Sequence, residues 1–170
     1  FVMFLKVLML KQDDPRKCSA AKLVKFGLAK PVTRTASRTL ILNPFSKKIL
    51  LKSDKKFVNS ITGIDCSWNL VTSAFKKPFT GISRKLPPLL AGNPMNYSKL
   101  NKLSTVEALA GAVYILGEPD LTHNLLQKFK WGNTFFELNK NLLQDYTKAQ
   151  SESEIFEICH EYGLADPQFT

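Results

Sequence analysis

The pattern of apolar residues predicts strands in the first half of the chain. Residues 1–10, FVMFLKVLML, are apolar at nine of ten positions, and shorter apolar runs follow at 38–44 and 61–68. Runs of this kind are typical of buried strands. Because the run at 1–10 is about half the length that crosses a bilayer and is interrupted by Lys6, we expect a strand there and not a membrane segment or a leader.

Two short helices and one long loop are expected around these strands. Residues 19–30, SAAKLVKFGLAK, favour a short helix that ends at Pro31. Residues 53–60, SDKKFVNS, favour a helix capped by Ser53. The segment 86–97, LPPLLAGNPMNY, is interrupted by proline and glycine, so an apolar loop is expected there.

From residue 104 onward the pattern becomes helical. Apolar residues recur at the i, i+3, i+4 and i+7 spacing of a helix with one buried face. Ser104 with Glu107, and Ser151 with Glu154, have the three-residue spacing of capping boxes at helix starts. The sequence therefore predicts an α/β half followed by a mostly helical half.

Charge is distributed unevenly between the two halves. Residues 1–90 contain 18 Lys and Arg against 4 Asp and Glu, a net charge of +14, whereas residues 91–170 contain 6 against 10, a net charge of −4. A dense basic face is expected of a protein that binds a phosphate backbone. Since RNA, DNA and an acidic protein would all fit, charge alone predicts only a polyanionic partner.

The cysteines, the histidines and the missing motifs disfavour several classes of protein. The chain has three separated cysteines and two histidines, which predict neither a disulfide framework nor a metal site. This cysteine usage favours a reducing compartment, and we expect a cytoplasmic protein. The sequence contains no GxGxxG, Walker A, HExxH or GxSxG motif, which disfavours a conventional dinucleotide site, a P-loop NTPase, a zinc protease and an α/β-hydrolase.

Four segments remain that carry candidate chemistry. They are DDPRKCSAAKLVKFG, LILNPFSKK, GIDCSWN and LPPLLAGNPMNYSKLNKLSTVEALAGAVYILG. In this order they resemble the ribosome-maturation family of S-adenosylmethionine-dependent aminocarboxypropyltransferases, of the archaeal type, which modifies small-subunit ribosomal RNA. The resemblance extends to KFKWGNTFFELNKNLLQDY and covers about residues 6–149.

The resemblance implies a SPOUT-like fold. The α/β N-terminal half would be threaded through a deep trefoil knot, and an all-helical C-terminal half would follow it. It also implies a basic α/β domain over residues 1–77 and a mainly helical domain over residues 78–170, with the cofactor site at their junction. Periodicity and spacing by themselves indicate no knot.

The function implied by the resemblance is transfer of the 3-amino-3-carboxypropyl group of S-adenosylmethionine to N3 of a hypermodified uridine or pseudouridine in small-subunit ribosomal RNA. No metal is expected, and the protein would act as a monomer on the RNA or a pre-ribosomal subunit, away from any membrane. Two other hypotheses are a SPOUT-type RNA methyltransferase and an RNA-binding assembly factor without chemistry. The apolar loop at 86–97, together with the DCSW segment, favours a small-molecule pocket and hence an enzyme.

The resemblance places the cofactor among loops of the first half and the start of the helical half. Apolar Leu42, Pro44 and Leu89 could enclose an adenine. Trp68 would offer a flat wall that also suits a sulfonium cation. The positions assigned to the cofactor are Ser19, Leu42, Pro44, Ile64, Asp65, Trp68, Leu89, Leu90 and Ser104.

Asp65 is the candidate for catalysis. It is the only acidic residue between Asp54 and Glu107, and it follows an apolar strand. It could favour the sulfonium, hold the amino group of the cofactor, or take the N3 proton of the target base. A structural aspartate that caps a turn fits the same position equally well.

RNA binding is expected beside the Cys18–Ser19 segment that is assigned to the cofactor. A phosphate backbone held there would bring a looped or flipped base to the reactive carbon. The candidate residues are Lys17, Lys22, Lys25 and Lys30.

Overall fold

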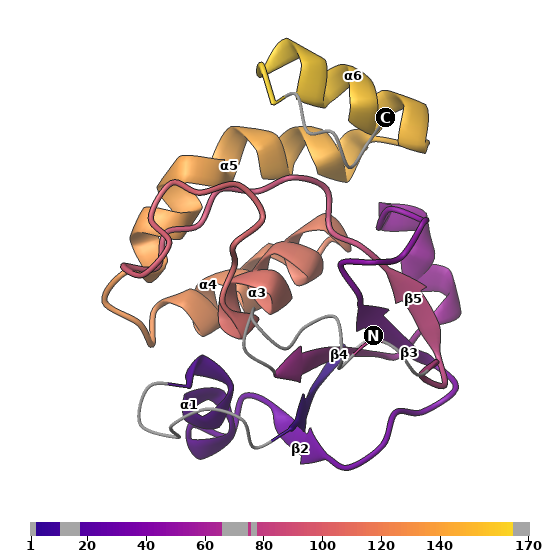
Figure 1. Ribbon diagram of the computed structural model, residues 1–170, viewed down its shortest axis with the longest axis vertical. Coiled ribbons are helices and arrows are strands. Elements are labelled where there is room, and N and C mark those ends of the chain that lie inside the picture. Colours follow the sequence, from indigo (N-terminus) through magenta and orange to yellow (C-terminus); the bar gives the residue numbers. More distant parts are fainter. Residues whose placement is uncertain (1–2, 11–17, 66–74, 76–77, 165–170) are drawn as a thin grey trace.

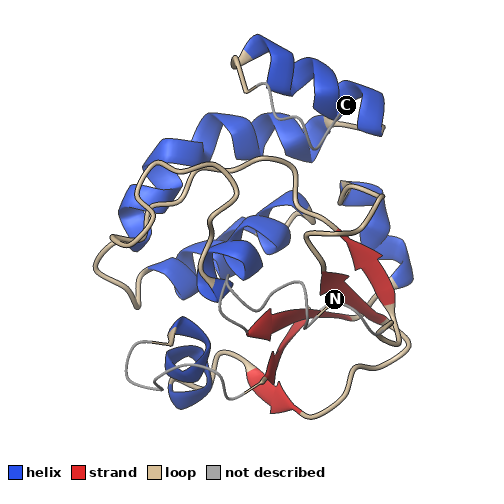
Figure 2. Cartoon of the chain, in the orientation of Figure 1, coloured by secondary structure: helices blue, strands red, loops and turns tan. Residues whose placement is uncertain are grey.

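A five-stranded parallel sheet forms one layer of the protein (Figures 1 and 2). The computed structural model describes residues 3–10, 18–65, 75 and 78–164. The strands lie in the order β2-β1-β4-β3-β5, and every neighbouring pair is parallel. Their bounds are Phe4–Met9 for β1, Lys30–Val32 for β2, Thr39–Leu42 for β3, Ser60–Asp65 for β4 and Ile82–Arg84 for β5.

The inner strands β3 and β4 are buried, which explains their apolar sequences. All four residues of β3 and the first four of β4 are buried. Thr39 and Thr62 lie on these two strands, and their hydroxyl oxygens are 2.7 Å apart, so each satisfies the other inside the sheet. The strands predicted at 1–10 and 38–44 are confirmed, and β4 confirms the described part of the strand predicted at 61–68.

The helices pack in successive layers beside the sheet (Figure 1). Helix α3 contacts β4 and is buried along most of its length, while α1, α4 and α5 pack against α3, and α6 lies against α5. A helix that is apolar on all sides is expected at the centre of a core. The bounds are Ser19–Lys25 for α1, Lys52–Phe57 for the 3-10 helix η1, Thr105–Ile115 for α3, Pro119–Leu126 for α4, Gly132–Lys148 for α5 and Glu152–Glu161 for α6.

The helical pattern from residue 104 onward is confirmed, and so are the two predicted helix starts. Ser104 Oγ accepts a hydrogen bond from the Glu107 amide, and Ser151 Oγ accepts one from the Glu154 amide. Each bond satisfies a main-chain donor that has no partner within the helix. Among the described helices, none has the length and apolarity to cross a bilayer.

The end of α1 differs from the prediction. The helix ends at Lys25, and Gly27 has a φ of +72°, a conformation that glycine adopts without strain. Pro31, predicted to end the helix, lies instead in β2. Since β2 is an edge strand that pairs only with β1, the missing amide hydrogen of proline costs no ladder bond.

The start of η1 also differs from the prediction. Its N-cap is Leu51 and not Ser53. The Asp54 carboxylate accepts a hydrogen bond from the Leu51 amide at 3.0 Å and pairs with the Arg84 guanidinium at 3.2 Å. The buried Asp54 therefore holds this turn against β5, and the serine at 53 remains exposed.

The predicted fold class, a SPOUT-like α/β half with a deep trefoil knot followed by an all-helical half, is wrong. The described residues form a small α/β domain around a single parallel sheet, and nothing in them supports the knot. The domain predicted at 78–170 is not all-helical, because it contains β5, which pairs with β3. A strand of three residues carries too little periodicity to be detected, and β2, of the same length, was missed for the same reason. The boundary at residue 77 lies outside the described residues and stays a prediction.

Candidate active site

The strand order places a topological switch point between the carboxyl ends of β1 and β4. These two strands are neighbours, and Met9 at the end of β1 pairs with Asp65 at the end of β4. The chain leaves β1 towards β2 on one side of the sheet, and it leaves β4 towards β5 on the other side. Ligands of open parallel sheets bind where neighbouring strands send their connections in opposite directions. The sheet therefore places Asp65 where a ligand is expected.

The Asp65 carboxylate joins three elements at this point. Cys18, the N-cap of α1, donates its Sγ hydrogen to Asp65 Oδ2 at 2.8 Å. Thr105, the first residue of α3, donates its hydroxyl hydrogen to Oδ1 at 3.2 Å. A carboxylate has about four lone-pair positions, so these two donors leave room for a donor from a bound molecule.

A second contact ties the start of α1 to the start of α3. The Ser19 hydroxyl oxygen accepts a hydrogen bond from the Val106 amide at 3.3 Å. This amide belongs to the first turn of α3, where main-chain donors have no partner within the helix. Ser19, assigned to the cofactor from sequence, therefore also fixes the two helix starts relative to Asp65.

Glu107 anchors the loop at 86–103 to the start of α3. Its side chain is fully buried, and its carboxylate accepts hydrogen bonds from the Gly92 amide at 2.6 Å and the Asn93 side-chain amide at 2.6 Å. The amide and hydroxyl of Ser104 donate to the same carboxylate, both at 2.9 Å. A Cβ at Gly92 would lie 2.5 Å from the Phe135 amide nitrogen, so the close approach of the loop to α5 requires glycine.

Asn139 anchors the other part of this loop from α5. Its side-chain oxygen accepts from the Leu90 amide at 2.7 Å, and its side-chain nitrogen donates to the Leu90 carbonyl at 2.8 Å. Nearby, the Tyr146 hydroxyl donates to the Pro88 carbonyl at 2.8 Å. Leu89 is fully buried, and a Cβ on Gly111 of α3 would lie 2.8 Å from its Cδ1. Of the two leucines assigned to the cofactor in this loop, Leu89 is therefore buried, and only the half-buried Leu90 offers a side chain to a ligand.

The remaining candidates are not all described. Leu42 is buried at the end of β3, Pro44 is exposed just beyond it, and Ile64 is half-buried in β4. Lys22, Lys25 and Lys30 are exposed on and after α1. Trp68 and Lys17 lie outside the described residues.

The sequence did not single out Thr105 or Asn139, and it identified Glu107 only as part of a capping box. Thr105 has no local signal that distinguishes it. Asn139 does have a local signal, because it is a polar residue on the apolar face of α5 between Phe135 and Leu142. A polar residue at such a position needs a buried hydrogen-bond partner. In the described part of the chain, no group of three His, Cys, Asp or Glu side chains could hold a metal ion.

Burial and the hydrogen bond to Asp65 raise the pKa of the Cys18 thiol from 9.0 to about 11. Folding therefore favours the protonated thiol. The resulting stability is fully present below pH 9 and is lost as the pH rises through about 11.

We expect native Cys18 to resist alkylation by iodoacetamide near neutral pH, because the thiolate is the reactive form. Peptide mass spectrometry after timed alkylation measures this directly, with the denatured protein as the reactive control. The free energy of unfolding should also fall between pH 9 and pH 11, and less so in Cys18→Ala. Rapid labelling of native Cys18 at neutral pH would contradict this account of the thiol.

The residues at this edge of the sheet fit S-adenosylmethionine. Asp65 lies at the expected end of the sheet, and its carboxylate offers an acceptor for an amino group or a neighbour for a sulfonium. Main-chain groups after β3 and in the loop at 86–103 can read an adenine or a ribose. Asp65, Ser19, Leu90 and the segment at 42–44 are the described residues that would hold this molecule.

Comparison with known proteins gives one family over most of the chain. Residues 40–163 match the family described as "Ribosome biogenesis protein, C-terminal". The 16S rRNA aminocarboxypropyltransferase of Methanococcoides burtonii is 39% identical over 93% of this chain and 94% of its own length. The enzyme of the same name from Sulfurisphaera tokodaii is 43% identical over 88% of this chain and 89% of its own.

A solved structure agrees with these relatives. The SAM-dependent rRNA:acp-transferase Tsr3 from Vulcanisaeta distributa superposes with a TM-score of 0.87 at 34% identity, over 99% of this chain and 93% of that chain. Residues 6–37 also match a family described as "Possible Fer4-like domain in RNase L inhibitor, RLI". Cys18 is the only cysteine in residues 6–37, so this segment cannot supply the four thiolates that hold an iron–sulfur cluster.

Proposed function

The chain belongs to the family of 16S rRNA aminocarboxypropyltransferases, and on that basis we propose that it transfers the 3-amino-3-carboxypropyl group of S-adenosylmethionine to small-subunit ribosomal RNA during ribosome biogenesis. The observation that carries the proposal is the identity of 39% to a named enzyme along 93% of the chain. The position of Asp65 supports it independently, since this residue lies at the switch point where a parallel sheet binds small molecules.

The reaction is a nucleophilic displacement that needs only S-adenosylmethionine and the RNA base as reactants. When bound, S-adenosylmethionine supplies the electrophilic side-chain carbon, and the rest of the molecule, methylthioadenosine, is the leaving group. A bond forms between this carbon and N3 of the hypermodified uridine or pseudouridine, the carbon–sulfur bond breaks, and the N3 proton goes to a base or to water. The protein must position the side-chain carbon, and not the methyl group, in line with N3.

Asp65 has two candidate roles in this site. It could take the N3 proton, or it could hold the amino group of the cofactor. The bonds from Cys18 and Thr105 fix the carboxylate in one orientation, which suits both roles. Trp68 is proposed to give a flat apolar wall for the cofactor, and Ser104 a contact at the start of α3.

Labelled cofactors test the reaction class. The protein is incubated with target RNA and S-adenosylmethionine labelled either in the carboxyl group or in the methyl group, and the RNA nucleosides are analysed by mass spectrometry. The proposal requires that only the carboxyl label enters the RNA. Entry of the methyl label instead would mean an RNA methyltransferase, and entry of neither would leave an assembly factor without chemistry.

Binding of RNA should depend on lysines of the α1 region. Lys22, Lys25 and Lys30 are all exposed. The Lys22 amino group also makes a cation–π contact, 5.9 Å from the centre of the Phe129 ring, so Lys22 is left unchanged in this test. Replacing Lys25 and Lys30 by Gln should flatten the slope of log affinity against log salt by about 1.4 units, since each neutralised phosphate of a single strand contributes about 0.7. Fluorescence anisotropy over a salt series measures the slope.

The control removes an equal charge elsewhere. Arg34 and Lys140 are exposed and lie outside α1, so Arg34→Gln/Lys140→Gln should change the slope much less. Lys128, although it belongs to the acidic half, is unsuitable as a control, because its amino group lies 5.6 Å from the centre of the Phe26 ring beside α1. Equal slopes for the two double variants would show that Lys25 and Lys30 do not contact the RNA backbone.

Several finer points rest on the sequence resemblance. We propose a monomer of the archaeal type, located in the cytoplasm and acting on RNA or a pre-ribosomal subunit. We also propose that the cofactor site lies where the basic domain at 1–77 meets the domain at 78–170.

A further inference from the structure

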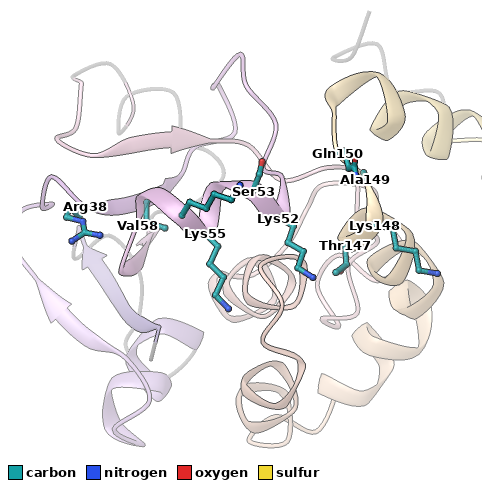
Figure 3. Close-up of a pocket in the computed structure, with 10 residues that line it drawn as sticks. Arg38, Lys52, Ser53, Lys55, Val58, Thr147, Lys148, Ala149 and Gln150 are labelled. Carbon is teal, nitrogen blue, oxygen red and sulfur yellow. The ribbon is translucent and has the colours of Figure 1, made fainter. Parts of the chain in front are cut away.

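A basic cavity lies at the edge of the sheet opposite to Asp65. Its volume is about 880 Å³. Three segments border it: Arg38 just before β3, η1 with Val58 after it, and residues 147–150 at and after the end of α5 (Figure 3). β4 starts just beyond η1 and runs for six residues to Asp65. At about 3.3 Å per residue, the two ends of β4 are about 17 Å apart, so the cavity is distinct from the site at Asp65.

Positive charge dominates the lining of the cavity. The ten lining residues are Arg38, Lys52, Ser53, Lys55, Lys56, Val58, Thr147, Lys148, Ala149 and Gln150, which include five cations and no acid. Figure 3 shows Lys52 and Lys55 extending from η1 in the same direction, with Arg38 on one side and the end of α5 on the other. Cations gathered around a hollow repel one another, and a bound polyanion relieves this repulsion.

Internal contacts account for two of the five cations. Lys55 pairs with Glu118 at 2.9 Å. Lys52 passes over the end of α3, where a Cβ on Gly117 would lie 3.4 Å from its Cε, and a cation is favourable beside the last carbonyls of a helix. Among the described residues, no carboxylate lies within ion-pair distance of Arg38, Lys56 or Lys148. These three charges therefore have no structural function that the contacts reveal.

The walls of the cavity are held in place by other residues. The Asn59 amide donates to the Arg38 carbonyl at 3.0 Å, which ties the starts of β3 and β4 together. The buried Asp54 holds η1 through Leu51 and Arg84. The Ile49 amide donates to the Glu152 carboxylate at 2.8 Å, which links this side of the sheet to the start of α6. The cations are thus presented on a fixed backbone.

We propose that this cavity binds the phosphate backbone of the RNA substrate at a distance from the nucleotide that reacts. The inference rests on the proposed function, which makes RNA the polyanion. Flexible cations with nearby hydroxyl and amide groups, here Ser53, Thr147 and Gln150, are the side chains that contact phosphates. No aromatic side chain lines the cavity, so the lining lacks the aromatic anchors of a protein interface.

A charge-matched pair of variants tests the proposal. Arg38→Gln/Lys56→Gln removes two cavity charges that have no described ion-pair partner, and Arg34→Gln/Lys140→Gln removes one arginine and one lysine outside the cavity. Affinity for a fluorescent fragment of small-subunit ribosomal RNA is measured by anisotropy across a salt series. The cavity variant should bind more weakly at low salt, with a slope flatter by about 1.4 units, and the control variant should stay near the wild type.

Cross-linking gives a second readout on the unmodified protein. RNA that contains 4-thiouridine is irradiated in the complex, and the cross-linked peptides are identified by mass spectrometry. Cross-links in residues 52–58 or 147–150 are expected. A cavity variant that matches the control in slope, together with no cross-link in either segment, overturns the proposal.

The label experiment separates this proposal from the proposed function. If the wild type transfers the carboxyl label but the cavity variant binds RNA as the control does, the cavity inference fails alone. If the wild type transfers no label, the proposed function fails, and a steep salt slope lost in the cavity variant would still support RNA binding at this cavity.

Discussion

Replacing Asp65 by Asn is expected to slow aminocarboxypropyl transfer by roughly 100-fold or more. Asparagine keeps the size of the side chain but removes the charge. It also brings an amide nitrogen to face Cys18 or Thr105, both of which donate to Asp65. Single-turnover rates at saturating cofactor and calorimetric cofactor affinity should be measured on the same preparation.

The two measurements separate the roles of Asp65. A slow rate with unchanged affinity identifies proton abstraction, whereas weak affinity with a normal rate at saturation identifies a cofactor anchor. If both stay normal, Asp65 has only the structural role of joining the starts of α1 and α3. Asp120→Asn, an exposed aspartate in the first turn of α4, is the matched control and should change neither quantity. Thr105→Val keeps the carboxylate but removes one donor, so we expect a smaller loss of rate.

Replacing Glu107 by Ala is expected to lower the free energy of unfolding by about 3–5 kcal/mol, because each buried donor left without an acceptor costs about 1–3 kcal/mol. The side chain is fully buried, and its loss leaves the Gly92, Asn93 and Ser104 donors without their acceptor. Cofactor affinity should fall as well, because the loop at 86–103 would lose its anchor on α3. Urea unfolding and calorimetric titration measure the two effects.

Two further variants keep the Glu107 prediction specific. Glu137 is half-exposed on α5 and pairs only weakly with Lys140, so Glu137→Ala should change stability by less than about 0.5 kcal/mol. Glu107→Gln keeps the volume but replaces one acceptor oxygen by a donor, so it should fall between wild type and Glu107→Ala. A Glu107→Ala protein with wild-type stability would show that the contacts with Asn139 and Tyr146 of α5 are enough to hold the loop.

Local patterns predicted most of the regular structure. The apolar runs gave β1, β3 and the described part of β4, and the capping serines gave the starts of α3 and α6. These features depend on neighbours within a few residues, so a single sequence contains them. The two strands that the sequence did not predict depend instead on contacts with distant residues. The edge strands β2 and β5 have three residues each, and only their pairing partners make them strands.

The candidate site was predictable only in part. Asp65 stood out because no other acid is near it in sequence, and Ser19 and Ser104 followed from the resemblance. The loop residues Leu42, Leu89 and Leu90 came the same way, and their assignment to the cofactor stays a prediction. Asn139 was missed although it interrupts the apolar face of α5, because its partner Leu90 is 49 positions away.

The sequence by itself determined the family, the strands and helices with strong local patterns, and the uneven distribution of charge. It did so because ordered motifs, periodicity and net charge are properties of the chain that need no contact between distant residues. Only the tertiary structure decided that one sheet takes strands from both sides of residue 77, and that Cys18 and Thr105, 47 and 40 positions from Asp65, meet at its carboxylate. It also decided that Arg38, Lys56 and Lys148 surround one cavity. These arrangements depend on packing between distant segments, where each contact lowers the free energy only once the whole core is assembled.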